Sequence, residues 1–323
     1  MSAKIFSLLV LLLAGTGCQQ VADEPKENNL RINQLQFVGS HNSYKKAMSP
    51  AHAEALRNTN PQAAAALEYE HIPLAEQLDL GLRKLELDIF VLPQSSDFSV
   101  GHVQVIDMNS HCETLSLCLA QLRQWSDANS SHVPIWISFN AKDSVINGLP
   151  EPMAFTAEAL ADLDQLLEKA LGDRLIRPRD IVNLQWPELE QARGRVILIL
   201  DEQGAKRDMY LQDWQNRPMF TNVAQDHPAA AIMIINDPVA EQEEIIRLVQ
   251  QGFMVRTRAD ADTLEARRGD TTRRDAAFAS GAQAISTDYY LPTNPFATDY
   301  SVQLPDGIRC NPVLTTGRCR IAE

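Results

Sequence analysis

Basic residues are in the minority in this 323-residue chain. Lysine and arginine number 29 against 42 aspartates and glutamates, which gives a formal net charge of −13. Such an excess of negative charge repels the phosphate backbone of nucleic acids, so a nucleic-acid binder is excluded as the leading idea. It also argues against a polybasic patch on a membrane surface. A lipid-like substrate would have to be met locally, at the rim of an active site.

The chain also lacks an obvious hydrophobic run long enough to cross a bilayer, which takes about 20 apolar residues. The apolar run at residues 5–14 follows Lys4 and leads to small residues and Cys18. This pattern indicates a secretory signal peptide over residues 1–17. Because Cys18 follows Gly-Thr-Gly, the segment resembles the lipobox of bacterial lipoproteins, which implies lipidation of Cys18. An ordinary signal peptide cut near Cys18 is the alternative.

Residues 18–30 are polar and charged, and we expect them to form a flexible tether. The protein would then lie in the cell envelope, held to the membrane by the lipid on Cys18, or be secreted. Gln19 after Cys18 would permit sorting to the outer membrane of a Gram-negative cell.

Cysteines are few. Apart from Cys18, the four others lie in two close pairs: Cys112 with Cys118, and Cys310 with Cys319. Neither pair has the two-residue spacing typical of zinc sites. An exported protein meets an oxidising compartment, so we expect disulfides. Three pairings are possible, and the short separations favour the two local ones.

A glycine-rich dinucleotide-binding loop is missing, and so is an internal linker rich in Pro, Gly or Ser. We therefore expect one domain over residues 31–323. Apolar segments that predict strands alternate with amphipathic segments that predict helices, which favours a parallel sheet. Eight strands favour a closed α/β fold, a single TIM-like (β/α)8 barrel, allowing for distortion. The predicted strands are 35–39, 82–90, 98–103, 134–139, 196–200, 231–235, 253–257 and 284–287, and the predicted helices are 113–125, 154–171, 241–250 and 271–280.

Polar side chains lie at the C-terminal ends of six predicted strands, where a barrel collects its reactive groups. Histidines together with hard oxygen ligands suit phosphoryl transfer with a divalent cation. A soluble α/β protein also places polar residues after strands by chance, so the coincidence of six strands is what favours a site. In strand order the residues are His41 and Asn42; Glu86 and Asp88; His102; Asn140, Lys142 and Asp143; Arg256 and Arg258; and Asp288 and Tyr289.

The motifs His41-Asn42-Ser43-Tyr44, residues 85–88 (Leu-Glu-Leu-Asp) and Gly101-His102 resemble the X-box of phosphoinositide-specific phospholipases C. The chain is also similar to the bacterial calcium-dependent phosphoinositide phospholipase C-like family over roughly residues 32–320. The segments that carry this wider resemblance are 112–125, 186–187, 193–195, 253–289, 300–302 and 309–312.

The resemblance implies a TIM-like barrel that cleaves the bond between inositol phosphate and glycerol by attack of the inositol 2-hydroxyl. His41 would stabilise the phosphoryl oxygens, and His102 would protonate the leaving alkoxide. Asn42, Glu86 and Asp88 would hold Ca²⁺, which lowers the pKa of the attacking hydroxyl and neutralises charge on phosphorus. Either Glu86 or Asp88 would serve as the general base.

Asn140 stands where animal phospholipases C carry a glutamate ligand. Its amide oxygen is acceptable to hard cations, but the lost negative charge should weaken calcium binding. Lys142 is expected to contact phosphate. Arg256 and Arg258 are expected to alternate in direction, so that only one points into the barrel; one would bind phosphate and the other pair with Asp260 or Asp262. Tyr289 would stack on the inositol ring.

Two other functions remain open. A phosphodiesterase acting on glycerophosphodiesters uses a similar barrel, although that family usually opens with a His-Arg-Gly motif and here His41 is followed by Asn-Ser-Tyr. A non-catalytic surface lipoprotein that binds a polyol or glycan is the third possibility, and the retention of both histidines with Glu86 and Asp88 counts against it. In every case we expect a monomer with no nucleic-acid partner.

Overall fold

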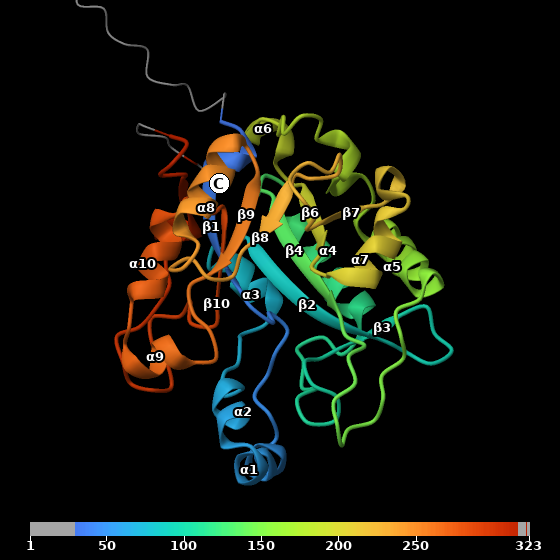
Figure 1. Ribbon diagram of the computed structural model, residues 1–323, viewed down its shortest axis with the longest axis vertical. Helices are drawn as coiled ribbons and strands as arrows, with labels where there is room; N and C mark the ends of the chain where they lie inside the picture. The colour runs from blue at the N-terminus through green and yellow to red at the C-terminus, as the bar shows by residue number, and fades with distance from the viewer. Residues whose placement is uncertain (1–29, 316–320, 322–323) are drawn as a thin grey trace, which may run out of the picture.

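The computed structural model describes residues 30–315 and residue 321, and it shows parallel strands curled into a half-barrel with helices outside (Figure 1). The parallel strands are paired in the order β7-β6-β4-β2-β1-β10-β9-β8. Among the described residues no backbone pairing joins β7 to β8, so the sheet is open at that seam. The α/β class and the distorted TIM-like barrel are thus confirmed. The strands are β1 (Leu35–Ser40), β2 (Lys84–Val91), β4 (Ile135–Ala141), β6 (Val196–Leu200), β7 (Met219–Thr221), β8 (Ile232–Ile234), β9 (Met254–Arg258) and β10 (Ala284–Thr287).

Three further strands complete the sheet. β3 (Phe98–Val100) pairs antiparallel with β2, β5 (Leu175–Ile176) lies beside β6, and β11 (Ile308–Cys310) pairs antiparallel with β1. The prediction of a parallel barrel strand at 98–103 was therefore wrong. Only residues 92–97 connect β2 to β3, and a parallel crossover needs a dozen or more residues. The eighth strand of the half-barrel is instead β7, whose two apolar residues, Met219 and Phe220, give no clear apolar run.

Four amphipathic helices lie within a few residues of their predicted ranges: α4 (Leu115–Ala128), α5 (Ala157–Leu171), α8 (Gln242–Gln251) and α10 (Thr272–Ala279). In α5, for example, the Thr156 hydroxyl accepts a hydrogen bond from the backbone N–H of Ala159 and begins the helix. Its leucines at 160, 163, 167 and 171 recur at three- and four-residue spacing and are all buried. Burial of this one face holds the helix against the sheet.

The remaining helices are α1 (Pro50–Thr59), α2 (Pro61–Ala66), α3 (Leu74–Asp79), α6 (Leu189–Ala192), α7 (Gly204–Leu211) and α9 (Leu264–Arg268). Figure 1 shows α1 and α2 standing apart from the barrel, at the lower end of the view. None of the side chains of α1 is buried. Within the described ranges, no helix is long and apolar enough to cross a membrane.

Alternation along the strands separates an outer core from an inner one. In β4, Ile137 and Phe139 belong to the cluster that includes the leucines of α4 and α5, whereas Trp136 belongs to a second cluster with Phe37 and Ile197. Residues two apart in a strand share a face. The polar positions Lys84, Glu86 and Asp88 of β2 therefore share one face of the sheet, opposite Leu85 and Leu87.

One predicted disulfide is confirmed, between Cys112 and Cys118. Cys310 is also disulfide-bonded. Its predicted partner, Cys319, lies outside the described residues, as do the predicted signal peptide at 1–17, Cys18 and nearly all of the tether. Those features remain predictions.

Candidate active site

A pocket of about 440 Å³ opens at the C-terminal ends of the parallel strands. Inward-facing residues of several strands line it because parallel strands end at the same edge of the barrel. Of the residues predicted at the strand ends, the pocket lining contains all but Asp143, Asp288 and Tyr289; Asp143 pairs with Lys206 instead. Those in the lining are His41, Asn42, Glu86, Asp88, His102, Asn140, Lys142, Arg256 and Arg258.

His41 follows β1 and is held by a buried carboxylate from the other end of the chain. Its Nδ1 lies 3.0 Å from Oδ1 of Asp288, which follows β10, and β10 is the hydrogen-bonded neighbour of β1. Burial and the Arg258 guanidinium lower the pKa of His41, against the opposing effect of Asp288 and Glu86. The ring is therefore neutral near pH 7. With its proton on Nδ1 toward Asp288, Nε2 is left as a base.

Asp288 is ionised when it holds His41. Burial would raise its pKa, but His41 and Arg258 outweigh that effect and the pKa of this carboxyl is lowered. Its neighbour Asp260 accepts a hydrogen bond from the Asp288 backbone N–H at 2.9 Å, and burial with the nearby Asp288 charge raises the pKa of Asp260 to about 7. Sequence reasoning placed Asp288 among the polar residues at the strand ends but gave it no partner, because no pattern in the chain pairs it with His41.

His102 reaches the pocket because β3 returns antiparallel along β2. Its Nδ1 lies 3.2 Å from Oδ2 of Asp107, a carboxylate five residues further along the same loop. Asp107 is buried, and its other oxygen lies 3.2 Å from the ammonium of Lys45. Two histidines in one pocket, each oriented by a buried carboxylate, form the arrangement that general acid–base catalysis needs.

Glu86 lies at the centre of the pocket among cations. Its Oε2 is bonded to the Lys84 ammonium and lies 2.8 Å from the Arg256 guanidinium, and its Oε1 accepts from the Asn140 amide at 3.1 Å. Burial alone would raise the pKa of Glu86, but Lys84 and Arg256 hold it well below the usual range. Burial also lowers the pKa of Lys84 to about 8. A carboxylate held this way is a poor proton acceptor, which argues against Glu86 as the general base.

Both carboxylate oxygens of Asp88 also contact nitrogen donors. Its Oδ1 accepts from the Asn140 amide at 2.8 Å, and its Oδ2 lies 3.0 Å from the Lys142 ammonium. Asn42 donates to the Tyr69 hydroxyl at 2.7 Å from a left-handed backbone conformation with φ 47°. The Tyr69 hydroxyl is in turn 3.5 Å from Nδ1 of His41.

A family model described as phosphoinositide phospholipase C, Ca²⁺-dependent, matches residues 30–101 and 93–312, which is most of the chain. The chain belongs to this family. Membership confirms the resemblance inferred from the motifs and supports phospholipase C activity of the phosphoinositide type in general terms.

Solved structures share the fold of this phospholipase C family member. The calcium-dependent phosphoinositol-specific phospholipase C of a Gram-negative Pseudomonas species is 16% identical, with a TM-score of 0.56 over 89% of this chain and 97% of that one. The calcium-dependent phosphatidylinositol-specific enzyme of Streptomyces antibioticus is 17% identical, with a TM-score of 0.54 over 80% and 95%.

The curated relatives carry no assigned function. Uncharacterized proteins from two strains of Mycobacterium tuberculosis are each 28% identical over 180 residues, which is 53% of this chain. The match spans about a third of their length, 32%.

Calcium is the metal that the family's description implies, and its predicted ligands Glu86, Asp88 and Asn140 do lie together. Every oxygen of the two carboxylates, however, already contacts a nitrogen donor, and three cations surround them. Among residues 30–315 and 321, no group of three or more acidic, histidine or cysteine side chains is placed to hold a metal ion. The donor set as it stands does not fit calcium.

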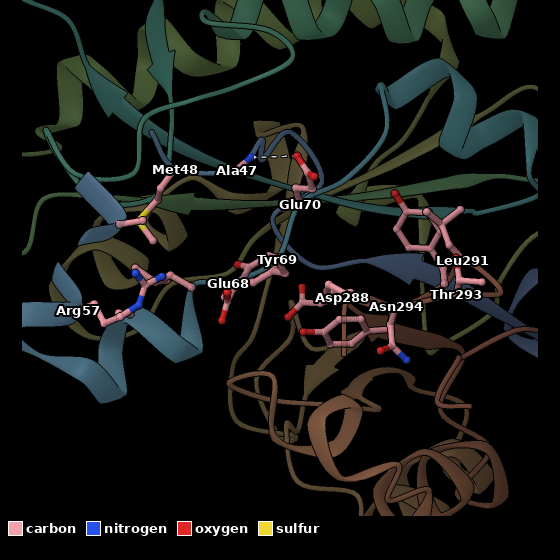
Figure 2. A pocket seen from close by; sticks show the side chains of 16 residues that line it. Ala47, Met48, Arg57, Glu68, Tyr69, Glu70, Asp288, Leu291, Thr293 and Asn294 are labelled. Atoms are coloured by element: carbon pink, nitrogen blue, oxygen red, sulfur yellow. Dashed lines mark hydrogen bonds between the residues drawn. The ribbon is translucent and has the colours of Figure 1, made fainter. Parts of the chain in front are cut away.

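A second cavity, of about 550 Å³, lies beside the pocket (Figure 2). Figure 2 shows Met48 and Arg57 on one side, Leu291, Thr293 and Asn294 on the other, and Tyr69 with Asp288 between them. The lining also includes Ala53 of α1, Ala64 of α2 and Leu67, which directly follows α2. The segment after β10 contributes Tyr289, Tyr290 and Pro295. Much of this wall is apolar, unlike the charged pocket.

Two substrate-binding predictions need revision. Arg256 and Arg258 do not alternate, because residues two apart in a strand point to the same side; both line the pocket, Arg256 at Glu86 and Arg258 with Asp288 3.8 Å away. Tyr289 lines the second cavity instead, and its ring packs edge-on against Phe296 and Tyr300. It is therefore not placed to stack on a sugar in the pocket.

Asp201 and Glu202 also line the pocket, directly after β6, and sequence reasoning missed them. Burial raises the pKa of Asp201 to about 6. The signal was available, since the buried run at 196–200 ends in an Asp-Glu pair as other strands end in polar groups. Lys84 was missed for a different reason: a lysine inside a strand gives no sign that its ammonium points inward.

Proposed function

We propose that the chain is a phosphodiesterase that cleaves phosphatidylinositol-type lipids, with His41 as general base and His102 as general acid. The observation that carries the proposal is the pair of histidines in one cation-lined pocket, each bonded through Nδ1 to its own buried carboxylate. A module that only binds a polyol has no need for two such pairs. The family's description supports the same class of reaction.

The reaction begins at a hydroxyl next to the phosphodiester on the inositol ring. Nε2 of His41 takes the hydroxyl proton, and Asp288 stabilises the imidazolium that forms. The ring oxygen forms a bond to phosphorus, and the bond from phosphorus to the glycerol oxygen breaks. His102 gives that oxygen a proton, so the products are a cyclic phosphate and a neutral diacylglycerol. This role for His41 differs from the one that the resemblance implied.

Positive side chains stabilise the charge that grows on the phosphoryl oxygens. Arg256, Arg258 and Lys142 line the pocket for this purpose. Nε of Arg256 is buried and has no hydrogen-bond partner among the described residues.

A lipid substrate is favoured over a soluble glycerophosphodiester by the surroundings of the pocket. The second cavity shares Tyr69 and Asp288 with the surroundings of His41 and has a largely apolar wall. Val105 and Val145 are exposed on the two loops that border the pocket, at 56% and 65% of their surface. Exposed apolar side chains at the mouth of a site suit contact with a lipid surface.

The cell-envelope location, lipid anchor and monomeric state remain part of this proposal and depend on sequence alone. Lipidated Cys18 would hold the enzyme close to its substrate. Replacing Cys18 by alanine should move the protein from the membrane fraction to the soluble fraction of the cell, and a variant that stays with the membrane would contradict the anchor.

Turnover of phosphatidylinositol tests the proposal. The full chain, in mixed micelles of phosphatidylinositol and detergent, should release water-soluble inositol phosphate. His41→Ala and His102→Ala should each lose about 10²–10⁴-fold in rate, as expected for loss of a general base or acid. His52→Ala, at an exposed histidine of α1, is the matched control and should keep wild-type activity. Near-normal turnover in either pocket variant would contradict the assignment.

A further inference from the structure

The side chains around Glu86 supply positive charge where a calcium ion was expected. Two cations, Lys84 and Arg256, share one of its oxygens, and the Asn140 amide occupies the other. A calcium ion bound to Glu86 would have to displace at least one of these donors. It would also have to tolerate the charges of Lys84 and Arg256 at close range.

Lys84 is fixed in place. Its side chain is 0% exposed, and its ammonium donates to the Ser40 carbonyl at 3.0 Å and the Ser286 hydroxyl at 2.9 Å as well as to Glu86. An ammonium has three hydrogens, so every one has an acceptor. If the side chain turned away, buried acceptors would be left unpaired, which is costly.

Asp88 is likewise surrounded by nitrogen donors of the protein where a calcium ion was expected. Lys142 contacts one oxygen and the Asn140 amide the other. Asn140 itself is neutral, so the position contributes no charge to hold a divalent ion. Two carboxylates with three cations leave this cluster with one formal positive charge.

We propose that Lys84, Arg256 and Lys142 take the place of calcium in this member of a calcium-dependent family, and that it works without a metal ion. The second half rests on the proposed phosphodiesterase activity. Arg256 and Lys142 line the pocket and face the phosphate, while Lys84 neutralises Glu86 beneath them. Fixed positive charge that is already in position stabilises a developing phosphoryl anion without a bound cation.

Calcium binding is measured first, because it does not depend on turnover. The thermal midpoint of the full-length wild-type protein in detergent should be the same in millimolar calcium and in chelator, since a ligand raises it only by binding the folded state. Asn140→Glu combined with Lys142→Gln should gain a calcium-dependent rise of several degrees. Lys142→Gln alone, at a partly exposed side chain, should gain a smaller one. Lys169→Gln, at an exposed lysine of α5, is the matched control and should gain none.

Saturable one-to-one calcium binding by the wild type, lost in Asp88→Asn, would overturn the proposal. Turnover of phosphatidylinositol gives the second readout: equal rates in chelator and in calcium support it, and a rate that chelator abolishes overturns it. If no condition gives turnover, the proposed phosphodiesterase fails, and the calcium-binding result still decides whether the protein's cations exclude the metal.

Discussion

At the scale of the residue, the two histidines differ in how far their partners lie along the chain. Asp107 is five residues from His102, within one loop, whereas Asp288 is 247 residues from His41. The histidines themselves were predictable, because each follows a strand-like run in a short motif. The carboxylates that orient them could not be assigned from the sequence. Asp288 comes next to His41 only because β10 pairs with β1. Asp107 is close to His102 along the chain, but the sequence does not show that its side chain points toward that histidine.

Replacing Asp288 by asparagine tests its function as the positioning residue for His41. The Asp288 charge raises the pKa of His41, so its loss lowers that pKa further. The acidic limb of the pH–rate profile should move to lower pH, and the rate should fall by about 10²–10⁴-fold because the imidazolium loses its counter-charge.

Asp299→Asn, at an exposed acid near the same end of the chain, should change neither the rate nor the profile. If Asp288→Asn lowers the rate but leaves the acidic limb of the pH–rate profile in place, Asp288 has a structural role and does not set the pKa of His41.

At the scale of the element, four amphipathic helices and seven of the eight strands that form the half-barrel could be predicted, but one strand direction could not. A run such as 98–103 has the same apolar pattern in a parallel strand and in a hairpin. The short connection at 92–97 was the available signal for the antiparallel direction. That reversal matters for the site, because it brings His102 back along β2 to the pocket. β7 escaped prediction because it has only two apolar residues, Met219 and Phe220, whereas the equally short β8 lies within the apolar run 231–235.

The two loops at the pocket mouth give a prediction at this scale. Val105→Asp and Val145→Asp place a charge where we expect contact with a lipid surface. Each should lower the rate on phosphatidylinositol in vesicles by about tenfold, the effect of losing roughly one valine side chain's burial. The rate on soluble glycerophosphoinositol should stay unchanged.

Val182→Asp is the control for surface charge, since Val182 is 63% exposed and lines neither cavity. Equal losses on the vesicle and the soluble substrate would contradict a lipid-contact role for these loops.

At the scale of the whole molecule, the pocket concentrates positive side chains although the chain as a whole is negatively charged. The chain carries a formal charge of −13, yet the pocket at the end of the half-barrel gathers Arg256, Arg258 and Lys142, with Lys84 beneath. Composition favoured a local site over a polyanion bound across the surface. It could not show that this site contains enough protein cations to compete with a metal, because that follows from side-chain direction within β2 and β9.

Identification of the first phosphorus-containing product tests the central claim most directly. In ³¹P NMR of phosphatidylinositol micelles with the full chain, the account predicts early formation of a cyclic inositol phosphate, absent with His41→Ala and normal with His52→Ala. Formation of an acyclic inositol phosphate as the first product, or no cleavage at all by folded protein with or without calcium, would contradict attack by the inositol hydroxyl with His41 as its base.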